Sequence, residues 1–325
     1  MDSRGKVIDL SQAIRRYVHD GAVISFSGFS ATQCPMAAIH EIIRQRIKDL
    51  HVVAASNGQA VDELIGGGCV EGIEIAYGGN GRFASTCIRF RRAIEKGEVK
   101  VEDYSNFQMT LRFMAGAMGV PYLPTYSSLG TDIVNKWGYS EEDRCRDSRL
   151  ATKKLVIADN PFNLTGEVDR LVLVPALQPD VTVLHAQKAD IWGNVQLMGL
   201  YFADIEQAKA SKELIVTCEE IVDTEDLRKD PNKNQILNFQ VSAVVEIPWG
   251  AYPCAVFGYY DYDPWFLRDL YPRVAKNDSE WQGYLDKYVH GTKNRQEFLE
   301  LIGMDRLLTL RADKEFGYNP SLNRR

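Results

Sequence analysis

A chain of 325 residues with 45% hydrophobic and 25% charged side chains has the composition of a compact globular protein, which excludes disorder, collagen and coiled coil as overall descriptions. The formal net charge of −6 argues against a nucleic-acid partner, because proteins that bind phosphate backbones usually carry a basic excess. No apolar run approaches the roughly 20 residues that cross a bilayer, and the N-terminal residues contain no apolar signal core, so we expect a cytoplasmic protein without a membrane partner.

Apolar runs alternate with amphipathic segments along the chain, which is typical of parallel strands joined by helices. We expect strands at residues 22–28, 50–56, 73–79, 155–159, 171–176, 181–187, 213–219 and 242–248. We expect helices at residues 11–19, 36–48, 83–96, 107–118 and 202–210. Several strands are continuous runs rich in Val and Ile, which suits strands covered on both faces. The predicted fold is an α/β open, doubly wound, mostly parallel sheet with helices on both faces.

The whole chain, residues 1–325, is predicted to form one such domain. Residues 131–163 are more polar and contain the run SEEDRCRDSR, so an exposed excursion or a boundary between subdomains is expected there. Residues 259–289 are rich in aromatic side chains, which either close the core of this chain or face another subunit. The six cysteines are scattered without a C-x-x-C pair, which indicates reduced thiols, and neither they nor the five histidines have the spacing of a metal site.

Three loops that each lead from a strand into a helix carry small residues. They are SFSGFSAT after the first strand, SNG after the second and GGNG after the third. Loops of this kind emerge at one edge of a parallel sheet, so we expect them to be neighbours in space. Such loops either bind a ligand or only turn the chain. The Gly-rich loop lacks the patterns of a P-loop and of a dinucleotide site. The candidate substrate-binding residues are Ser27, Gly28, Phe29, Ser30, Asn57, Gly79, Asn80 and Gly81.

No acidic residue in these loops stands out as a nucleophile. Glu219 and Glu220, and likewise Asp62 and Glu63, are expected where a helix begins, and carboxylates at that position usually interact with the helix dipole. Among the histidines, His185 is of most interest because it follows an apolar run and is expected near the same sheet edge. The sequence therefore predicts a binding site without an evident reactive group.

The run DGAVISFSGFSATQCP resembles the first signature of the class I CoA-transferases, and the chain is most similar to the A subunits of the glutaconate CoA-transferase type. The similar segments occur in the same order along the chain. They are VPYLPTYSSLGTDI, DNPF, HAQKADIWGNV, IVTCEEIV, RKDPNKN, PWGAYP and YYDYDPWFL. The open α/β fold that this resemblance implies agrees with the pattern of strands and helices.

The resemblance also accounts for the missing reactive group. In this family the catalytic glutamate belongs to a B half, within a Ser-Glu-Asn-Gly motif. The comparable strand end here is Ala55-Ser56-Asn57-Gly58, without a Glu, so no catalytic residue is expected in this chain. The resemblance implies a ping-pong exchange of CoA between an acyl-CoA and a small carboxylic acid, through a glutamyl thioester on a partner B subunit. CoA thioesters are then substrates, no cofactor is bound permanently, and a hetero-oligomer of the type A2B2 or larger is expected.

Two other functions remain open at this point. Related two-chain proteins act as acyl-CoA decarboxylases or ring-opening hydrolases, and the residue of the partner in the Ser-x-Asn-Gly position would decide between transfer and these reactions. A non-catalytic protein that binds an effector or a sugar phosphate on a similar sheet is the third possibility. The acyl group itself stays open, because Gly81 follows Asn80 where the glutaconate-type pattern has a small hydroxyl residue.

Overall fold

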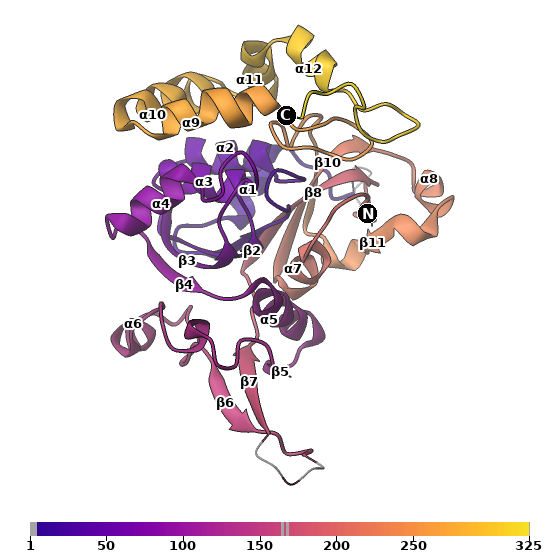
Figure 1. Cartoon of the computed structure of the whole chain (residues 1–325). Helices are drawn as coiled ribbons and strands as arrows, with labels where there is room; N and C mark the ends of the chain where they lie inside the picture. The colour runs from indigo at the N-terminus through magenta and orange to yellow at the C-terminus, as the bar shows by residue number, and fades with distance from the viewer. Residues whose placement is uncertain (1–4, 164–165, 167–168, 325) are drawn as a thin grey trace.

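The central layer of the molecule is a nine-stranded sheet (Figure 1). The structure is a computed structural model, and it describes residues 5–163, 166 and 169–324. Seven strands run parallel in the spatial order β12, β10, β8, β1, β2, β3, β4. They are β1 (Val23–Phe26), β2 (Leu50–Ser56), β3 (Val70–Tyr77), β4 (Lys100–Asp103), β8 (Val181–Ala189), β10 (Glu213–Ile221) and β12 (Ala243–Glu246). Antiparallel pairing adds β9 (Val195–Gln196) to the end of β8 and β11 (Asn234–Ile236) to β9. The predicted fold class is confirmed.

Strand β2 shows why these runs form the middle of a covered sheet. All seven of its residues are buried. Val52 and Ala54 belong to one hydrophobic cluster, while Val53 and Ala55 belong to another. Because successive side chains of a strand point to opposite faces, both faces of the sheet are covered.

Helices cover the two faces of the sheet. The first face carries α1 (Leu10–Tyr17), α2 (Met36–Arg44), α3 (Gln59–Gly66) and α4 (Ile88–Glu95). The second face carries α5 (Asn106–Met118) and α7 (Asp204–Ala210), while α8 (Thr224–Arg228), η2 (Pro231–Lys233) and η3 (Asn238–Gln240) lie near the β11 edge (Figure 1). Helix α4 starts later than the predicted residue 83, because residues 83–87 turn back onto the preceding loop, where Cys87 N donates to Gly78 O at 2.9 Å.

A small three-stranded sheet projects from one end of the molecule. It consists of β5 (Tyr122–Thr125), β7 (Arg170–Pro175) and β6 (Val156–Asp159), paired antiparallel. The runs 155–159 and 171–176, which we expected in the main sheet, therefore form part of a second sheet. The apolar side chains of β6 are incompletely covered, since Val156 is 40% and Ile157 is 37% exposed, whereas Val172 and Val174 of β7 are buried.

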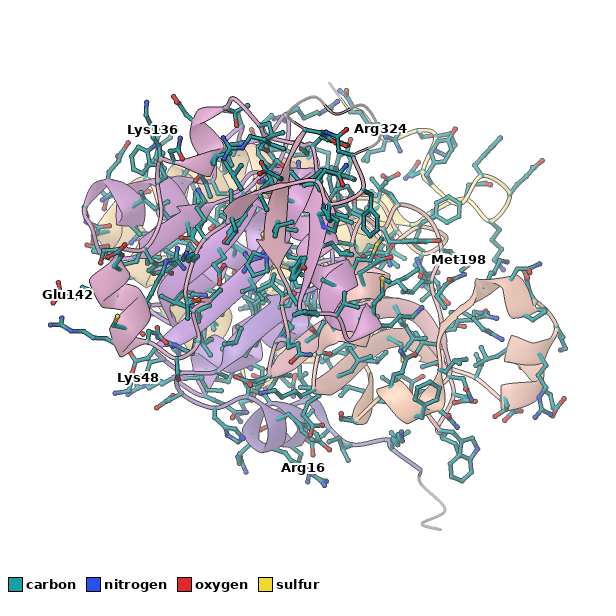
Figure 2. All side chains as sticks on the ribbon, turned by 90° about the horizontal axis from the view of Figure 1, so that it is seen from below. Arg16, Lys48, Lys136, Glu142, Met198 and Arg324 are labelled. Carbon is teal, nitrogen blue, oxygen red and sulfur yellow. The ribbon has the colours of Figure 1, made fainter. Side chains whose placement is uncertain are left out.

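The segment between β5 and β6 contains η1 (Asp132–Val134) and α6 (Glu141–Arg146). Figure 2 views the molecule from this end and shows Lys136 and Glu142 pointing outward. The division of the chain into one domain with an excursion at residues 131–163 stays a prediction.

The C-terminal helices form an outer layer over α2, α3 and α4 (Figure 1). They are η4 (Phe266–Leu270), α9 (Tyr271–Ala275), α10 (Asp278–Tyr284), η5 (Leu285–His290), α11 (Arg295–Ile302) and α12 (Met304–Leu310). Trp281 stacks on Tyr284 at 5.0 Å between ring centroids, and its Nε1 donates to Gly66 O at 2.6 Å. These rings are buried, so this aromatic segment closes the core of the chain itself. None of the helices described is long and apolar enough to span a membrane.

Candidate functional site

The loop between β1 and α2 turns immediately after the strand. Gly28 has a φ of +108°, and a Cβ at this position would lie 2.7 Å from Thr32 O and 2.8 Å from Cys34 Sγ, so only glycine fits. Phe29 N donates to Thr32 O at 3.0 Å, and Thr32 N donates to Phe29 O at 3.1 Å. This tight turn leaves Phe29 and Ser30 half-buried at the carboxyl edge of the sheet.

The second loop is hydrogen-bonded to the first. Asn57 Nδ2 donates to Ser27 O at 3.2 Å, and Ser30 N donates to Ser56 O at 3.4 Å. The Asn57 Oδ1 atom accepts from Val61 N at 3.3 Å in the first turns of α3. The Asn57 side chain therefore joins the two loops and holds the start of the helix.

The second loop also packs against the third. A Cβ on Gly58 would lie 2.0 Å from Asn80 Oδ1 and 2.5 Å from Gly79 O, so the backbones approach as closely as a glycine permits. Asn80 Nδ2 donates to Gln59 Oε1 at 2.8 Å. The prediction that the three loops are neighbours is confirmed by these contacts.

Two backbone amides of the third loop are unpartnered. Within the described part of the chain, Gly79 N and Gly81 N donate no hydrogen bond, whereas Asn80 N donates to Ala84 O at 2.8 Å. Gly81 is exposed with a φ of +55°. Free amides at a strand-to-helix turn can bind an anionic oxygen.

Asp204, at the start of α7, reaches the first loop from a distant part of the chain. Its Oδ1 accepts from Gly28 N at 3.0 Å, and its Oδ2 has no hydrogen-bond partner among the described residues. Asp204 is 1% exposed, and this burial raises the pKa of its carboxyl to about 7. Sequence reasoning missed this residue, because an Asp in the first turn of a helix is common and carries no motif.

A buried network of hydrogen bonds joins the first loop to β8 and β10. His185 N donates to Ser27 Oγ at 2.9 Å, and Ser27 Oγ donates to Gln33 O at 2.9 Å. The His185 ring lies 2.8 Å from Glu219 Oε1 through Nε2 and 2.9 Å from Thr217 Oγ1 through Nδ1. His185 is thus near the predicted edge, but it is fully buried and structural in its contacts.

Glu219 is the centre of this network. It accepts from Tyr260 OH at 2.6 Å, from Trp249 N at 2.7 Å and from Gly250 N at 3.2 Å. The expectation that Glu219 and Glu220 begin a helix is wrong, because both lie inside β10. The run of polar residues looked like a strand end, but parallel pairing with β8 extends the strand to Ile221.

Asp62 and Glu63 do lie in α3 as expected, yet they serve tertiary contacts. Asp62 accepts from Phe90 N at 2.7 Å and from Tyr271 OH at 2.8 Å, and burial raises its pKa to about 6. Glu63 pairs with His40 Nε2 at 2.8 Å. In the described residues no group of His, Cys, Asp and Glu side chains has the arrangement of a metal site.

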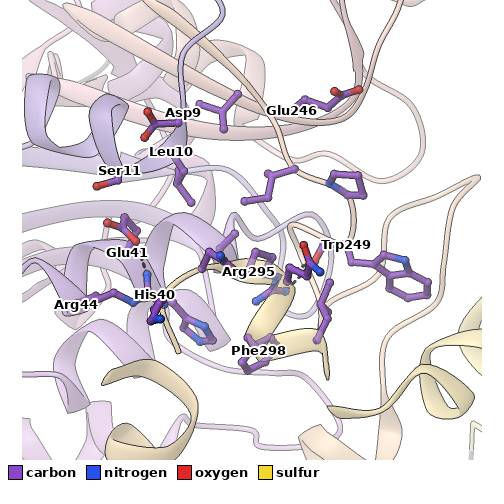
Figure 3. Close-up of a pocket in the computed structure, with 18 of the residues that line it drawn as sticks. Asp9, Leu10, Ser11, His40, Glu41, Arg44, Glu246, Trp249, Arg295 and Phe298 are labelled. Atoms are coloured by element: carbon purple, nitrogen blue, oxygen red, sulfur yellow. Dashed lines mark hydrogen bonds and ion pairs between the residues drawn. The ribbon is translucent and has the colours of Figure 1, made fainter. Parts of the chain in front are cut away.

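A cavity of about 1490 Å³ lies apart from the three loops. It is bounded by α1, α2, α11 and the chain after β12 (Figure 3). None of the eight predicted substrate-binding residues lines it. The described residues therefore offer two candidate sites. One is formed by the three loops at residues 27–32, 56–58 and 78–81, which we call the loop rim, and the other is this cavity.

The family model described as coenzyme A transferase matches residues 7–246. The chain belongs to the coenzyme A transferase family. It is 38% identical to the A subunit of glutaconate CoA-transferase from Acidaminococcus fermentans over 314 residues, with 97% of each chain covered. The crystal structure of glutaconate coenzyme A-transferase from that organism matches with a TM-score of 0.92 and covers 97% of this chain and 98% of that one.

Other relatives of the chain are named for different reactions. The A subunit of 3-oxoadipate CoA-transferase from Pseudomonas knackmussii is 36% identical, covering 90% of this chain and 96% of the relative. The cholesterol ring-cleaving hydrolase IpdA subunit of Rhodococcus jostii is 29% identical, covering 90% and 95%. A structure of the decarboxylase AibA/AibB is 27% identical with a TM-score of 0.67, covering 92% and 98%. The resemblance to the A subunits of CoA-transferases is thus confirmed, and the relatives of the chain include subunits named for a hydrolase and a decarboxylase.

Proposed function

We propose that this chain is the A subunit of a two-chain CoA-transferase of the cytoplasm, which exchanges CoA between an acyl-CoA and a small carboxylic acid. The reacting glutamate is supplied by a partner B subunit. The relatives with 38% and 36% identity are the A subunits of transferases, which favours this reaction. The naming of these relatives as subunits supports an assembly with a second chain, of the type A2B2 or larger.

The observation that carries the proposal is a rim with free amides and no available carboxylate. The sequence Ser56-Asn57-Gly58 has no Glu in the position where the B half has one. The acid that hydrogen-bonds to the rim is Asp204, and its carboxyl is 1% exposed and held by Gly28 N. A covalent step needs an accessible carboxylate. This rim therefore suits the half of an active site that binds and orients the acyl group.

The eight predicted residues divide into two groups by their contacts. Ser27, Gly28, Asn57 and Asn80 hydrogen-bond within the protein and position the loops. Phe29, Ser30, Gly79 and Gly81 are the group that we propose to contact the acyl part of the substrate, through side chains at Phe29 and Ser30 and through amides at Gly79 and Gly81.

In each step of the reaction a nucleophile attacks a carbonyl carbon and a leaving group departs. The glutamate of the partner attacks the thioester carbonyl and releases the CoA thiolate, giving an acyl-glutamyl anhydride. The thiolate then attacks the glutamyl carbonyl and releases the acyl carboxylate, leaving a glutamyl-CoA thioester, and the incoming acid reverses these steps. Each addition forms an oxyanion, and a donor placed for an oxyanion contributes about 3–4 kcal/mol. The amides of Gly79 and Gly81 are candidates for this role or for binding the carboxylate of the acyl group.

A direct test compares the purified chain with the complex that it forms with a B-type chain. We expect CoA transfer from acyl-CoA to a carboxylate only in the complex. Transfer by this chain alone would contradict the proposal.

A second reaction on the same scaffold, decarboxylation or ring-opening hydrolysis of an acyl-CoA, is favoured by the hydrolase and decarboxylase relatives. The residue of the B chain in the Ser-x-Asn-Gly position discriminates between them. A Glu there supports transfer, and another residue supports the second reaction.

A further inference from the structure

The projecting sheet of β5, β7 and β6, which we call the arm, has one largely apolar face. Strand β7 lies in the middle of the arm (Figure 1). Residues that pair across an antiparallel sheet point to the same face, so the register of the three strands defines the two faces. None of the residues that these described strands place on one of the faces is charged. We call it the arm face, and it consists of Tyr122, Pro124, Val156, Ala158, Leu171, Leu173 and Pro175.

The arm face is not covered by the rest of the chain. Leu171 and Leu173 are only half-buried, although they lie on the middle strand with a neighbouring strand on each side. On the opposite face of the same strand, Val172 and Val174 are fully buried. The difference shows that a second layer covers one face of the arm and not the other. Sheets normally bury an apolar face against another layer, and an exposed apolar patch marks an interaction surface.

The nearest charged side chains lie at the far end of the arm or on its other face. Asp169 accepts from Tyr126 OH at 2.9 Å and from Asn160 Nδ2 at 2.6 Å, so uncharged donors hold its carboxylate there. Asp159 and Arg170 pair in the register on the opposite face, next to the buried valines. A surface without charges needs no complementary charge on its partner, and it fits a second apolar surface of the same kind.

The arm leaves the main sheet at the edge opposite to the loop rim. Residues 176–180 connect β7 to the start of β8, and Asp180 Oδ2 accepts from Val23 N, the first residue of β1, at 2.9 Å. The loop rim follows the last residues of β1, β2 and β3. A strand of seven residues such as β2 separates the two edges by roughly 23 Å. A chain that brings its reacting group to the loop rim therefore docks away from the arm face.

We propose that the arm face is the contact between two copies of this chain, which pack arm face against arm face. The proposal rests on the proposed function in one respect, namely that an A2B2 assembly contains two copies of the chain. In a two-fold contact each copy supplies the same surface, so an uncharged apolar face is complementary to itself.

The size of the arm face sets the expected strength of this contact. Three strands about 4.8 Å apart, over about five residues of about 3.4 Å each, give a footprint of roughly 250 Å² per copy. Phe162, which is 83% exposed at the far end of the arm, adds apolar area. Because a standard interface buries about 800 Å² per partner, we expect the chain alone to dimerise reversibly, with a Kd on the order of 10–100 µM.

Sedimentation equilibrium of the chain alone, without a B-type chain, tests the contact. The average mass is expected to rise from that of a monomer towards that of a dimer between about 1 and 300 µM. Val156→Glu places a charge on the arm face at a position that is 40% exposed, and it is expected to raise the Kd at least tenfold. Leu308→Glu, at a position of α12 that is 49% exposed, is the matched control and is expected to leave the Kd unchanged. A wild-type chain that stays monomeric, or a dimer that Val156→Glu leaves intact, would overturn the proposal.

Photo-crosslinking locates the contact in a chain that keeps its fold. The aromatic amino acid p-benzoylphenylalanine replaces Tyr122, which is 49% exposed, and peptide mass spectrometry identifies the residues to which it couples on irradiation. Crosslinks to β5, β6 or β7 of a second copy are expected, both in the chain alone and in its complex with a B-type chain. Crosslinks to the B-type chain, or to any other part of the second copy, would overturn the proposal.

CoA transfer is assayed separately in the same complex. An inactive complex that retains the crosslinks between arms would contradict the proposed reaction and support the arm contact. An active complex without these crosslinks would support the reaction and overturn the arm contact.

Discussion

The carboxylate of Asp204 accepts the amide proton of Gly28 at 3.0 Å, although 176 residues separate them in the chain. Helix α7 thereby holds the turn that follows β1. Because Gly28 N is engaged by Asp204, this amide is not available to a substrate in the conformation described. The first loop therefore offers Phe29 and Ser30, while its backbone is held by the protein.

The substitution Asp204→Asn tests how far the buried carboxyl of Asp204 lowers the free energy of unfolding. Burial raises its pKa from 3.8 to about 7, so the folded protein binds a proton that the unfolded chain releases between pH 4 and pH 7. This group therefore lowers the free energy of unfolding as the pH rises through that range. The Asn variant removes the effect, and we expect it to gain stability relative to the wild type between pH 4 and pH 8, by at most about 4 kcal/mol.

Urea unfolding of both proteins at pH 4, 6 and 8 measures this difference. Asp305→Asn, at an exposed position of α12, is the control and is expected to show no change with pH relative to the wild type. A constant difference between Asp204→Asn and the wild type at all three values would contradict the raised pKa.

Ser27→Ala tests whether this serine holds the scaffold or binds the substrate. Its hydroxyl joins His185 N to Gln33 O, with both distances at 2.9 Å. Removing it leaves two buried backbone groups unpaired, which costs about 1–3 kcal/mol of unfolding free energy. Ser279→Ala, at an exposed position of α10, is the control and is expected to change stability by less than about 0.5 kcal/mol. Unchanged stability of Ser27→Ala together with a higher KM for the acyl-CoA would instead assign Ser27 to substrate contact.

Glu219→Gln probes the network beneath the first loop. Glu219 accepts hydrogen bonds from His185, Tyr260 and the backbone of Trp249, and an amide turns one of these acceptor positions into a donor. We expect a loss of roughly 2–4 kcal/mol in the free energy of unfolding by chemical denaturation, because a buried hydrogen-bond network is broken. Glu220→Gln is the matched control one residue away, with a side chain 50% exposed, and is expected to be nearly neutral. Equal effects of the two substitutions would contradict the role of Glu219.

Gly58→Ala tests the contact between the second and third loops. The added Cβ would lie 2.0 Å from Asn80 Oδ1 and 2.5 Å from Gly79 O, so the third loop must move. We expect a loss of about 1–3 kcal/mol in stability and a higher KM of the two-chain complex for acyl-CoA. Gly283→Ala in α10, where a Cβ meets no atom within 4 Å, is the control and is expected to be neutral or slightly stabilising. Wild-type kinetics in Gly58→Ala would show that the position of the third loop does not matter for substrate binding.

The sequence predicted those strands whose apolar residues form a continuous run in the middle of the sheet. The run LHVVAAS is β2 from its first residue to its last, because its side chains are covered on both faces. Residues 155–159 have a similar apolar character, yet they form β6 of the projecting antiparallel sheet. Which strand pairs with which depends on distant parts of the chain, since β7 pairs with both β6 and β5. The short strands β4, β5, β9 and β11 were not predicted, because few apolar residues mark them.

For the candidate site, too, the sequence predicted the local features and missed those that depend on distant contacts. The three loops were found from small residues at strand ends, and their proximity follows from parallel topology. Asp204 was not found and Glu219 was assigned to the start of a helix, because each acts through a contact with a distant part of the chain. Their burial, which makes their charges significant, is a property of the packed molecule and has no signature in the neighbouring residues.

The most direct test of a reacting glutamate on the partner is to locate the covalent intermediate. The complex of this chain with its B-type partner is incubated with acyl-CoA and treated with hydroxylamine, which converts a glutamyl thioester to a hydroxamate. Peptide mass spectrometry of both chains then identifies the modified residue. We predict a hydroxamate on a glutamate of the partner and none on this chain. A hydroxamate on any acidic residue of this chain would contradict the proposed division of the active site.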